Sequence, residues 1–135
     1  MPGHKDWLDK ASGDLKSSKK LIRDDDDTLD TAAYHAHQCA EKALKAYFVF
    51  LNKQVPKSHD LEFLLKSCIE FDLEFVSLKQ EIIDLNPYVT ESRYPDDQFV
   101  IDREEVEAAI KKATKVLNCV KKKLEATSDQ NLRIY

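Results

Sequence analysis

The chain has 135 residues, of which 42% are hydrophobic and 34% are charged, a balance typical of one globular domain rather than of a disordered chain. Its formal net charge of -4 argues against a protein that wraps duplex nucleic acid by neutralising phosphates. The 3 cysteines are widely spaced and form no CxxC pair, and the N-terminus MPGHKDWLDK lacks the apolar stretch of a signal peptide. We therefore expect a cytoplasmic protein with buried thiols and no membrane span.

The first predicted element is a helix from Lys5 to Arg23, because apolar residues recur there near helical spacing. Glycine and proline are scarce throughout, with 2 and 4 residues, so few turns are available and long helices are expected. The acidic run RDDDD ends this helix, and Asp27 or Thr28 is placed to cap the next one. Adjacent side chains on a turn rarely converge, so we predict no metal site at these aspartates.

The second predicted helix runs from about Thr28 to Asn52 and divides into two sides. Its broad apolar side begins with small residues, namely Ala33, Ala36, Ala40 and Ala43. Small side chains let neighbouring helices approach closely, so we expect this helix to be central. The narrower side is a polar arc made of Tyr34, His35, Gln38, Glu41, Lys42 and Lys45.

Two shorter helices are predicted next. Pro56 breaks the chain after the second helix, and Ser58 is a good N-cap for a third helix from His59 to about Glu70. A shorter fourth helix is expected from about Glu74 to Leu85, with an apolar stripe of its own.

The segment NPYVTESRYPDDQF is predicted to be a loop, and long ordered loops tend to carry function. Asp102 then caps the last helix, with Glu105 as its capping-box partner, and that helix is expected to reach about Ala126. Residues 127–135 are expected to fray. The sequence therefore predicts a single all-α domain over residues 1–135, an up-and-down helical bundle of four main helices plus one short helix.

The polar arc holds a base, an amide, a carboxylate and cations in one small region. Glu41 and Lys45 have the favourable i, i+4 order, for which a surface pair worth a few tenths of a kcal/mol is the simplest explanation. His59 follows a short connector, so it either lies near the far end of the second helix or is surface filler. His35 and His37 are two apart and face different directions on a helix, so they do not predict a shared metal.

Arg93 and Tyr94 lie in the proline-bracketed loop, where Pro95 restricts their directions. An arginine presented in this way suits bidentate capture of a phosphate or a carboxylate. The alternative is an internal salt bridge to a nearby carboxylate, Asp96, Asp97 or Glu41.

Three segments, AYHAHQCAEKALKAYF, HDLEFLLK and SRYPDD, together resemble the HEPN domain family (higher eukaryotes and prokaryotes nucleotide-binding). They match in order and at suitable spacing, over nearly the whole chain. The resemblance implies a helical bundle that is usually a homodimer and that binds nucleotides. It also implies a partner protein, because family members often act beside a minimal nucleotidyltransferase encoded next door, as a toxin–antitoxin-like pair.

Some members of the family are metal-independent ribonucleases with an R-x(4–6)-H motif, and this sequence departs from that motif. The end positions after Arg93 hold Gln98, Phe99 and Val100, and no other arginine is followed by histidine at that distance. The general acid or base for attack by a 2′-hydroxyl is therefore missing from its usual place. We do not carry ribonuclease activity over.

The resemblance and the residues together predict one ligand site. Its members are Gln38, Glu41, Lys42, Lys45, His59, Arg93, Tyr94 and Asp96. In this hypothesis the lysines and the arginine bind a phosphate, the tyrosine stacks on a base, and no metal or resident cofactor takes part. The leading interpretation is a nucleotide-binding partner subunit without enzymatic activity. A ribonuclease with a rearranged site and a purely structural partner subunit are the alternatives.

Overall fold

The computed structural model describes the backbone of residues 2–24, 27–90 and 101–134, and the side chains of these residues except 24 and 127–134. Within this part of the chain all regular structure is helical. The elements are α1 (His4–Asp24), α2 (Leu29–Phe50), α3 (Leu61–Ile69), the 3-10 helix η1 (Leu73–Leu78), α4 (Lys79–Leu85), the 3-10 helix η2 (Asn86–Tyr88) and α5 (Arg103–Ile134). The predicted all-α bundle is confirmed.

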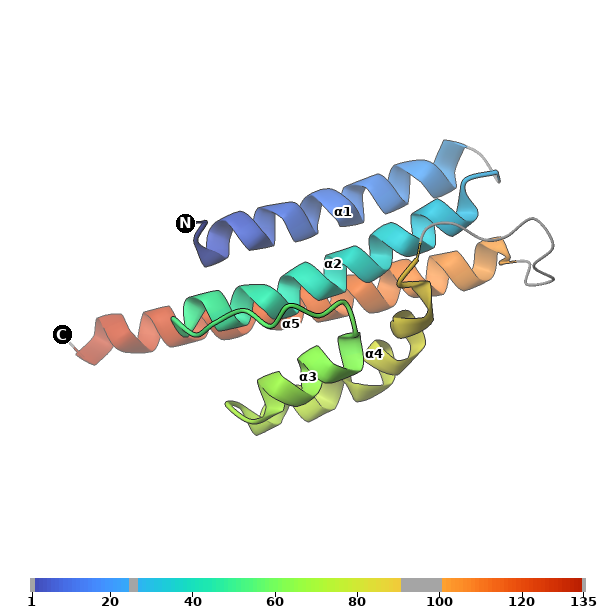
Figure 1. The fold of residues 1–135 in the computed structure, drawn as a ribbon. Coiled ribbons are helices and arrows are strands. Elements are labelled where there is room, and N and C mark those ends of the chain that lie inside the picture. Colours follow the sequence, from blue (N-terminus) through green and yellow to red (C-terminus); the bar gives the residue numbers. More distant parts are fainter. Residues whose placement is uncertain (1, 25–26, 91–100, 135) are drawn as a thin grey trace.

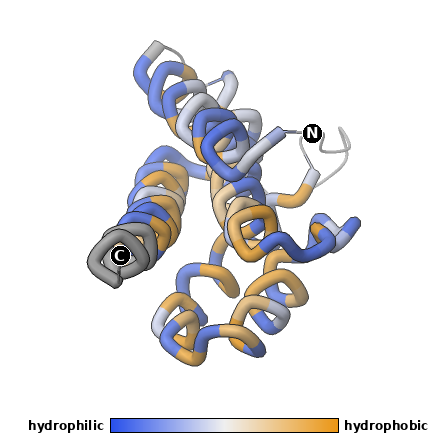
Figure 2. Tube along the Cα trace, turned by 90° about the vertical axis from the view of Figure 1, so that its left-hand side faces the viewer, coloured by the Kyte–Doolittle hydropathy of each residue, from blue (hydrophilic) through white to orange (hydrophobic). Residues whose placement is uncertain are grey.

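The long helices α1, α2 and α5 lie side by side, and α3 and α4 form a shorter layer beneath them (Figure 1). Helix α2 packs against α1, α5 and α3, so it is the central helix that its small residues predict. Hydrophobic segments lie mainly on the sides of the helices that face one another (Figure 2). No helix in the described ranges combines the length and the apolar character that crossing a membrane would need.

Small residues allow α1 to approach α2 closely. Ala36, Ala40 and Ala43 on α2 have no exposed surface. Ser18 of α1 is also fully buried, and its hydroxyl donates a 2.6 Å hydrogen bond to the carbonyl of Ala32 on α2. The bond satisfies a hydroxyl that would otherwise be costly to bury.

The connector, residues 51–60 between α2 and α3, determines what covers α2. Asn52 adopts a left-handed conformation with φ 60°, and the Lys53 amide donates to the Phe48 carbonyl at 2.9 Å, a common way to end a helix. The chain then turns back and runs along α2 before α3 begins (Figure 1). Val55 packs against the core on the way. His59 consequently lies opposite the middle of α2, beside Glu41, and not near the far end of that helix, which was one of the two alternatives for it.

The start of α3 differs from the sequence prediction. The helix begins at Leu61, and its N-cap is Asp60, whose carboxylate accepts from the amides of Glu62 at 3.0 Å and Phe63 at 3.4 Å. The prediction of Ser58 as the cap is wrong, because its hydroxyl is used to accept from the Asp60 amide at 3.1 Å. Asn86 holds the start of the helix from another element, accepting from the Leu61 amide at 2.8 Å.

The predicted fourth helix begins as the 3-10 helix η1 and becomes α-helical only at Lys79. Side chains three apart eclipse in a 3-10 helix, and Phe75 and Leu78 use this spacing to enter the core with 0% and 1% exposure. Helix α5 continues to Ile134, beyond the expected end near Ala126, and no glycine or proline follows Asp102 to stop it.

Candidate functional site

Glu41, Lys45 and His59 form a cluster, here named the Glu41 cluster, where the connector crosses α2. The Glu41 carboxylate accepts from the Lys45 ammonium at 3.1 Å through one oxygen and lies 3.0 Å from Nδ1 of His59 through the other. The Glu41 and Lys45 side chains are only 5% and 9% exposed, whereas the His59 side chain is 74% exposed. The i, i+4 pair is thus confirmed, but it is buried beneath the connector and is no surface pair.

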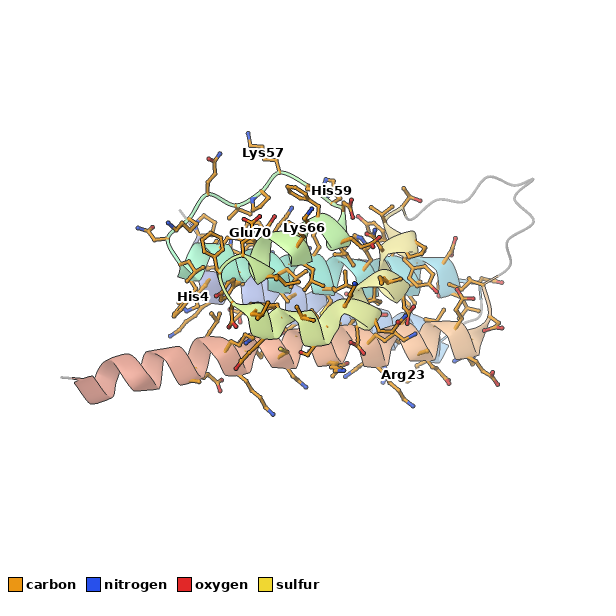
Figure 3. All side chains as sticks on the ribbon, turned by 90° about the horizontal axis from the view of Figure 1, so that it is seen from below. His4, Arg23, Lys57, His59, Lys66 and Glu70 are labelled. Carbon is orange, nitrogen blue, oxygen red and sulfur yellow. The ribbon has the colours of Figure 1, made fainter. Side chains whose placement is uncertain are left out.

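The chemistry of the Glu41 cluster follows from its donors. A carboxylate only accepts, so Nδ1 of His59 carries the proton and Nε2 is the other nitrogen of an exposed ring. Figure 3 shows His59 on the connector, near Lys57. An ammonium has three N–H donors. Within the described residues, Lys45 donates one hydrogen bond, to Glu41, and its other two N–H groups have no partner there. One carboxylate therefore holds a nearly buried cation and an exposed imidazole beside each other.

A second cluster, here named the Asp14 cluster, joins α1 to α2. Asp14 accepts from Lys42 at 2.5 Å and lies 2.8 Å from Nδ1 of His35, and its side chain is 10% exposed. It repeats the composition of the Glu41 cluster, a buried carboxylate shared by a histidine and a lysine. Lys42 was predicted to share one ligand site with Lys45. Its ammonium instead donates to Asp14 on α1, whereas that of Lys45 donates to Glu41.

Gln38 makes contacts within α2. Its amide donates to the Tyr34 hydroxyl at 2.9 Å, and the Tyr34 ring packs edge-on to His35 with centroids 5.6 Å apart. The predicted polar arc is therefore a set of hydrogen-bonded side chains that divides into three parts: the Glu41 cluster, the Asp14 cluster and the Gln38–Tyr34 pair.

The predicted loop residues Arg93, Tyr94 and Asp96 lie outside the described residues. Their convergence with α2 stays a prediction. Among the residues that the structure describes, no group of three or more His, Cys, Asp or Glu side chains is arranged to hold a metal ion.

His37 and Asp14 were not predicted as members of a site. His37 is fully buried, and neither ring nitrogen has a hydrogen-bond partner in the described ranges, although Gln38 and the His59 backbone lie near the ring. Burial lowers its pKa because a charged ring would be desolvated, and the negative charge of Glu41 opposes part of this shift. Two features of the sequence could have revealed these residues. His37 lies one turn before Glu41, and Asp14 interrupts the apolar stripe of α1.

The lowered pKa of His37 predicts a pH-dependent stability. The unfolded chain binds this proton with the ordinary pKa of 6.5, whereas the folded chain binds it less tightly. The unfolded state thus takes up more protons below pH 6.5, and the contribution of neutral His37 is fully present above that value and declines as the pH falls. We expect urea unfolding to show a steeper loss of stability from pH 7 to pH 5 in wild type than in His37→Leu. Equal slopes would contradict this, and His4→Leu serves as the control for a histidine that is not fully buried.

The comparisons with known proteins agree with this fold. The model of the HEPN domain family matches residues 4–123. The structure is similar to that of TT1696 from Thermus thermophilus, with 29% identity, a TM-score of 0.73, and coverage of 91% of this chain and 99% of the other. It is also similar to ST0689, described as an archaeal HEPN homologue, with 22% identity, a TM-score of 0.70, and coverage of 92% and 99%. A search of curated proteins gives no match.

Proposed function

Because the chain belongs to the HEPN domain family, we propose that its Glu41 cluster binds a phosphate group of a nucleotide. The observation that carries the proposal is Lys45, a nearly buried ammonium whose donors are only partly used within the described residues. A phosphate oxygen would accept from Lys45, and the exposed His59 would donate to it through Nε2 when that nitrogen also carries a proton. Glu41 fixes both groups, so little side-chain freedom is lost when the anion binds.

The loop residues complete the proposed site. Arg93 would add a bidentate contact to the same phosphate, and Tyr94 would stack on the base. Asp96 would orient the arginine. Gln38 and Lys42 are less well suited to this phosphate than predicted, because Tyr34 engages the Gln38 amide and Asp14 holds the Lys42 ammonium outside the Glu41 cluster.

The proposal extends to partners. We infer a homodimer that acts as the partner subunit of a minimal nucleotidyltransferase in a toxin–antitoxin-like pair. The support is the resemblance of the three motif segments to family members of that kind. A nucleotidyltransferase encoded beside this gene that co-purifies with the chain is the expected finding.

A calorimetric titration with ATP, GTP and AMP tests the nucleotide proposal. Lys45→Met preserves the buried side-chain volume while removing the charge, and a charged hydrogen bond is worth enough for an expected loss of about tenfold or more in affinity. His59→Ala is expected to weaken binding by a smaller factor. Lys79→Ala, an exposed lysine on α4, is the matched control and should bind like wild type. Absent binding in wild type, or equal binding in all variants, would remove the proposal.

One observation favours a second candidate function, a metal-independent ribonuclease. His59 is an exposed imidazole whose Nδ1 is held by a buried carboxylate, an arrangement that suits a general base. Its Nε2 would take the proton of a 2′-hydroxyl, the oxygen would attack the adjacent phosphorus, and the 5′-oxygen would leave with a proton from a second acid. Incubating structured RNA with the purified protein in the presence of a chelator tests the ribonuclease function. Cleavage by the wild type that is lost in His59→Ala would support this function, and RNA that stays intact with the wild type would rule it out.

A further inference from the structure

A hollow of about 420 Å³ lies between the start of α1 and α2, beside the Asp14–Lys42 pair. It is lined by Pro2, Asp6, Trp7, Lys10 and Lys42. No member of the Glu41 cluster lines it, so nothing in the proposed function accounts for it. Its volume falls in the range of sites that hold a small organic ligand, about 300–1,000 Å³.

Two lysines, Lys10 and Lys42, line this hollow. Lys42 is held by Asp14, and its side chain is 28% exposed, so the buried carboxylate fixes a cation that still reaches the surface. Lys10 is exposed and has no ion pair within the described part of the chain. The one carboxylate in the lining, that of Asp6, accepts from the Gly3 amide at 2.9 Å. The lining therefore presents two ammonium groups and one carboxylate, and the second carboxylate, that of Asp14, pairs with Lys42 without lining the hollow.

Trp7 gives the hollow a flat apolar surface. Its side chain is half-buried, although an indole of this size packed only for stability would normally be covered more completely. Indole faces stack well on the rings of nucleic-acid bases, and this stacking tolerates any base because every base has a π-face. Adjacent ammonium groups bind phosphate oxygens. A planar aromatic ring that carries a phosphate satisfies both features of the lining together.

We propose that this hollow is a second ligand site, which binds a nucleoside monophosphate with its base on Trp7 and its phosphate between Lys10 and Lys42. The nucleotide is either free or the 5′-terminal nucleotide of an RNA strand, since both present the same ring and phosphate. Asp14 positions Lys42, and His35 on the other carboxylate oxygen keeps Asp14 in place.

The chain has 1 tryptophan and 5 tyrosines, so fluorescence excited where only tryptophan absorbs reports on Trp7 alone. Titration with AMP is expected to change the Trp7 signal in a saturable way, and adenosine and inorganic phosphate are each expected to bind at least about tenfold more weakly, since each keeps half of the contacts. A short RNA with a 5′-phosphate is compared with the same RNA carrying a 5′-hydroxyl. Preference for the phosphorylated RNA over AMP assigns the site to RNA ends, and the reverse assigns it to free nucleotides.

Matched lysine variants test which cations act. Lys10→Ala and Lys42→Ala are each expected to weaken AMP binding about three- to tenfold, whereas Lys16→Ala, an exposed lysine of the same helix, should bind like wild type. Lys10 is exposed, so its variant will fold even if removal of Lys42 disturbs Asp14. A wild-type signal that does not saturate, adenosine binding as tightly as AMP, or equal affinity in Lys10→Ala and Lys16→Ala would overturn the proposal. Lys45→Met is expected to show the same change in Trp7 fluorescence with AMP as the wild type, which would separate the hollow from the Glu41 cluster.

Discussion

Replacing Glu41 with glutamine is expected to lower the free energy of unfolding by about 3 kcal/mol, because removing one partner of a buried ion pair leaves the other charge uncompensated. The Lys45 side chain is 9% exposed, and its ammonium has Glu41 as its hydrogen-bond partner within the described residues. The variant also replaces one accepting oxygen with an NH2 donor, so the side chain can no longer accept from both Lys45 and His59, and the contact with His59 holds the end of the connector.

Urea unfolding followed by circular dichroism measures this loss, and the midpoint of thermal unfolding should fall by about 10 °C. Glu70→Gln is the matched control because Glu70 is exposed, and its change should stay within about 0.5 kcal/mol. The double variant Glu41→Gln with Lys45→Met should regain part of the loss, since no buried charge is left alone. A single-variant loss close to that of Glu70→Gln would mean that the cluster contributes nothing to stability.

Replacing Phe75 with alanine is expected to cost about 3–5 kcal/mol of stability, the range for removing a fully buried phenylalanine. Phe75 on η1 has 0% exposure, and its ring packs edge-on against Tyr47 of α2 with centroids 4.7 Å apart. The Lys123 ammonium of α5 lies 5.0 Å from the ring centroid. The side chain thus joins the short helical layer to two of the long helices.

Phe71→Ala provides the comparison for Phe75→Ala. Phe71 is 49% exposed and contacts Phe48 with ring centroids 6.2 Å apart, so its removal opens no enclosed cavity. We expect its cost to be below about 1.5 kcal/mol in the same urea experiment. Equal costs for the two variants would show that η1 is not anchored through Phe75.

Apolar spacing predicted the fold well because each helix has one period and one buried face. On η1 and α4, Phe75, Leu78, Ile82 and Leu85 have at most 1% exposure. On α5 the apolar residues at helical spacing are all buried, namely Val106, Ala109, Ile110, Ala113, Val116, Leu117, Val120 and Leu124. Helix ends were harder to place. Ser58 and Asp60 both suit an N-cap, and only the position of Asn86, which is distant in the sequence, favours Asp60.

The candidate site was predicted less well because spacing on one helix does not reveal what covers it. Lys42 and Lys45 are close together on a helical wheel, yet each ammonium turns to the nearest carboxylate, Asp14 on α1 and Glu41 on α2. The burial of Glu41 depends on the path of the connector, which no periodicity encodes. The resemblance of the motif segments led to Glu41, Lys45 and His59 as members of one predicted ligand site. The structure brings these three side chains together, and their binding of a ligand stays a prediction.

The most direct test of the Glu41 cluster is the NMR signal of the His59 imidazole during a titration with ATP. The signal is assigned with His59→Gln, and the same titration is repeated on Glu41→Gln. If the phosphate binds between Lys45 and His59, the His59 signal moves in a saturable way in wild type, and the shift is lost or strongly weakened in Glu41→Gln. Bound ATP that leaves the His59 signal in place would contradict the proposed site.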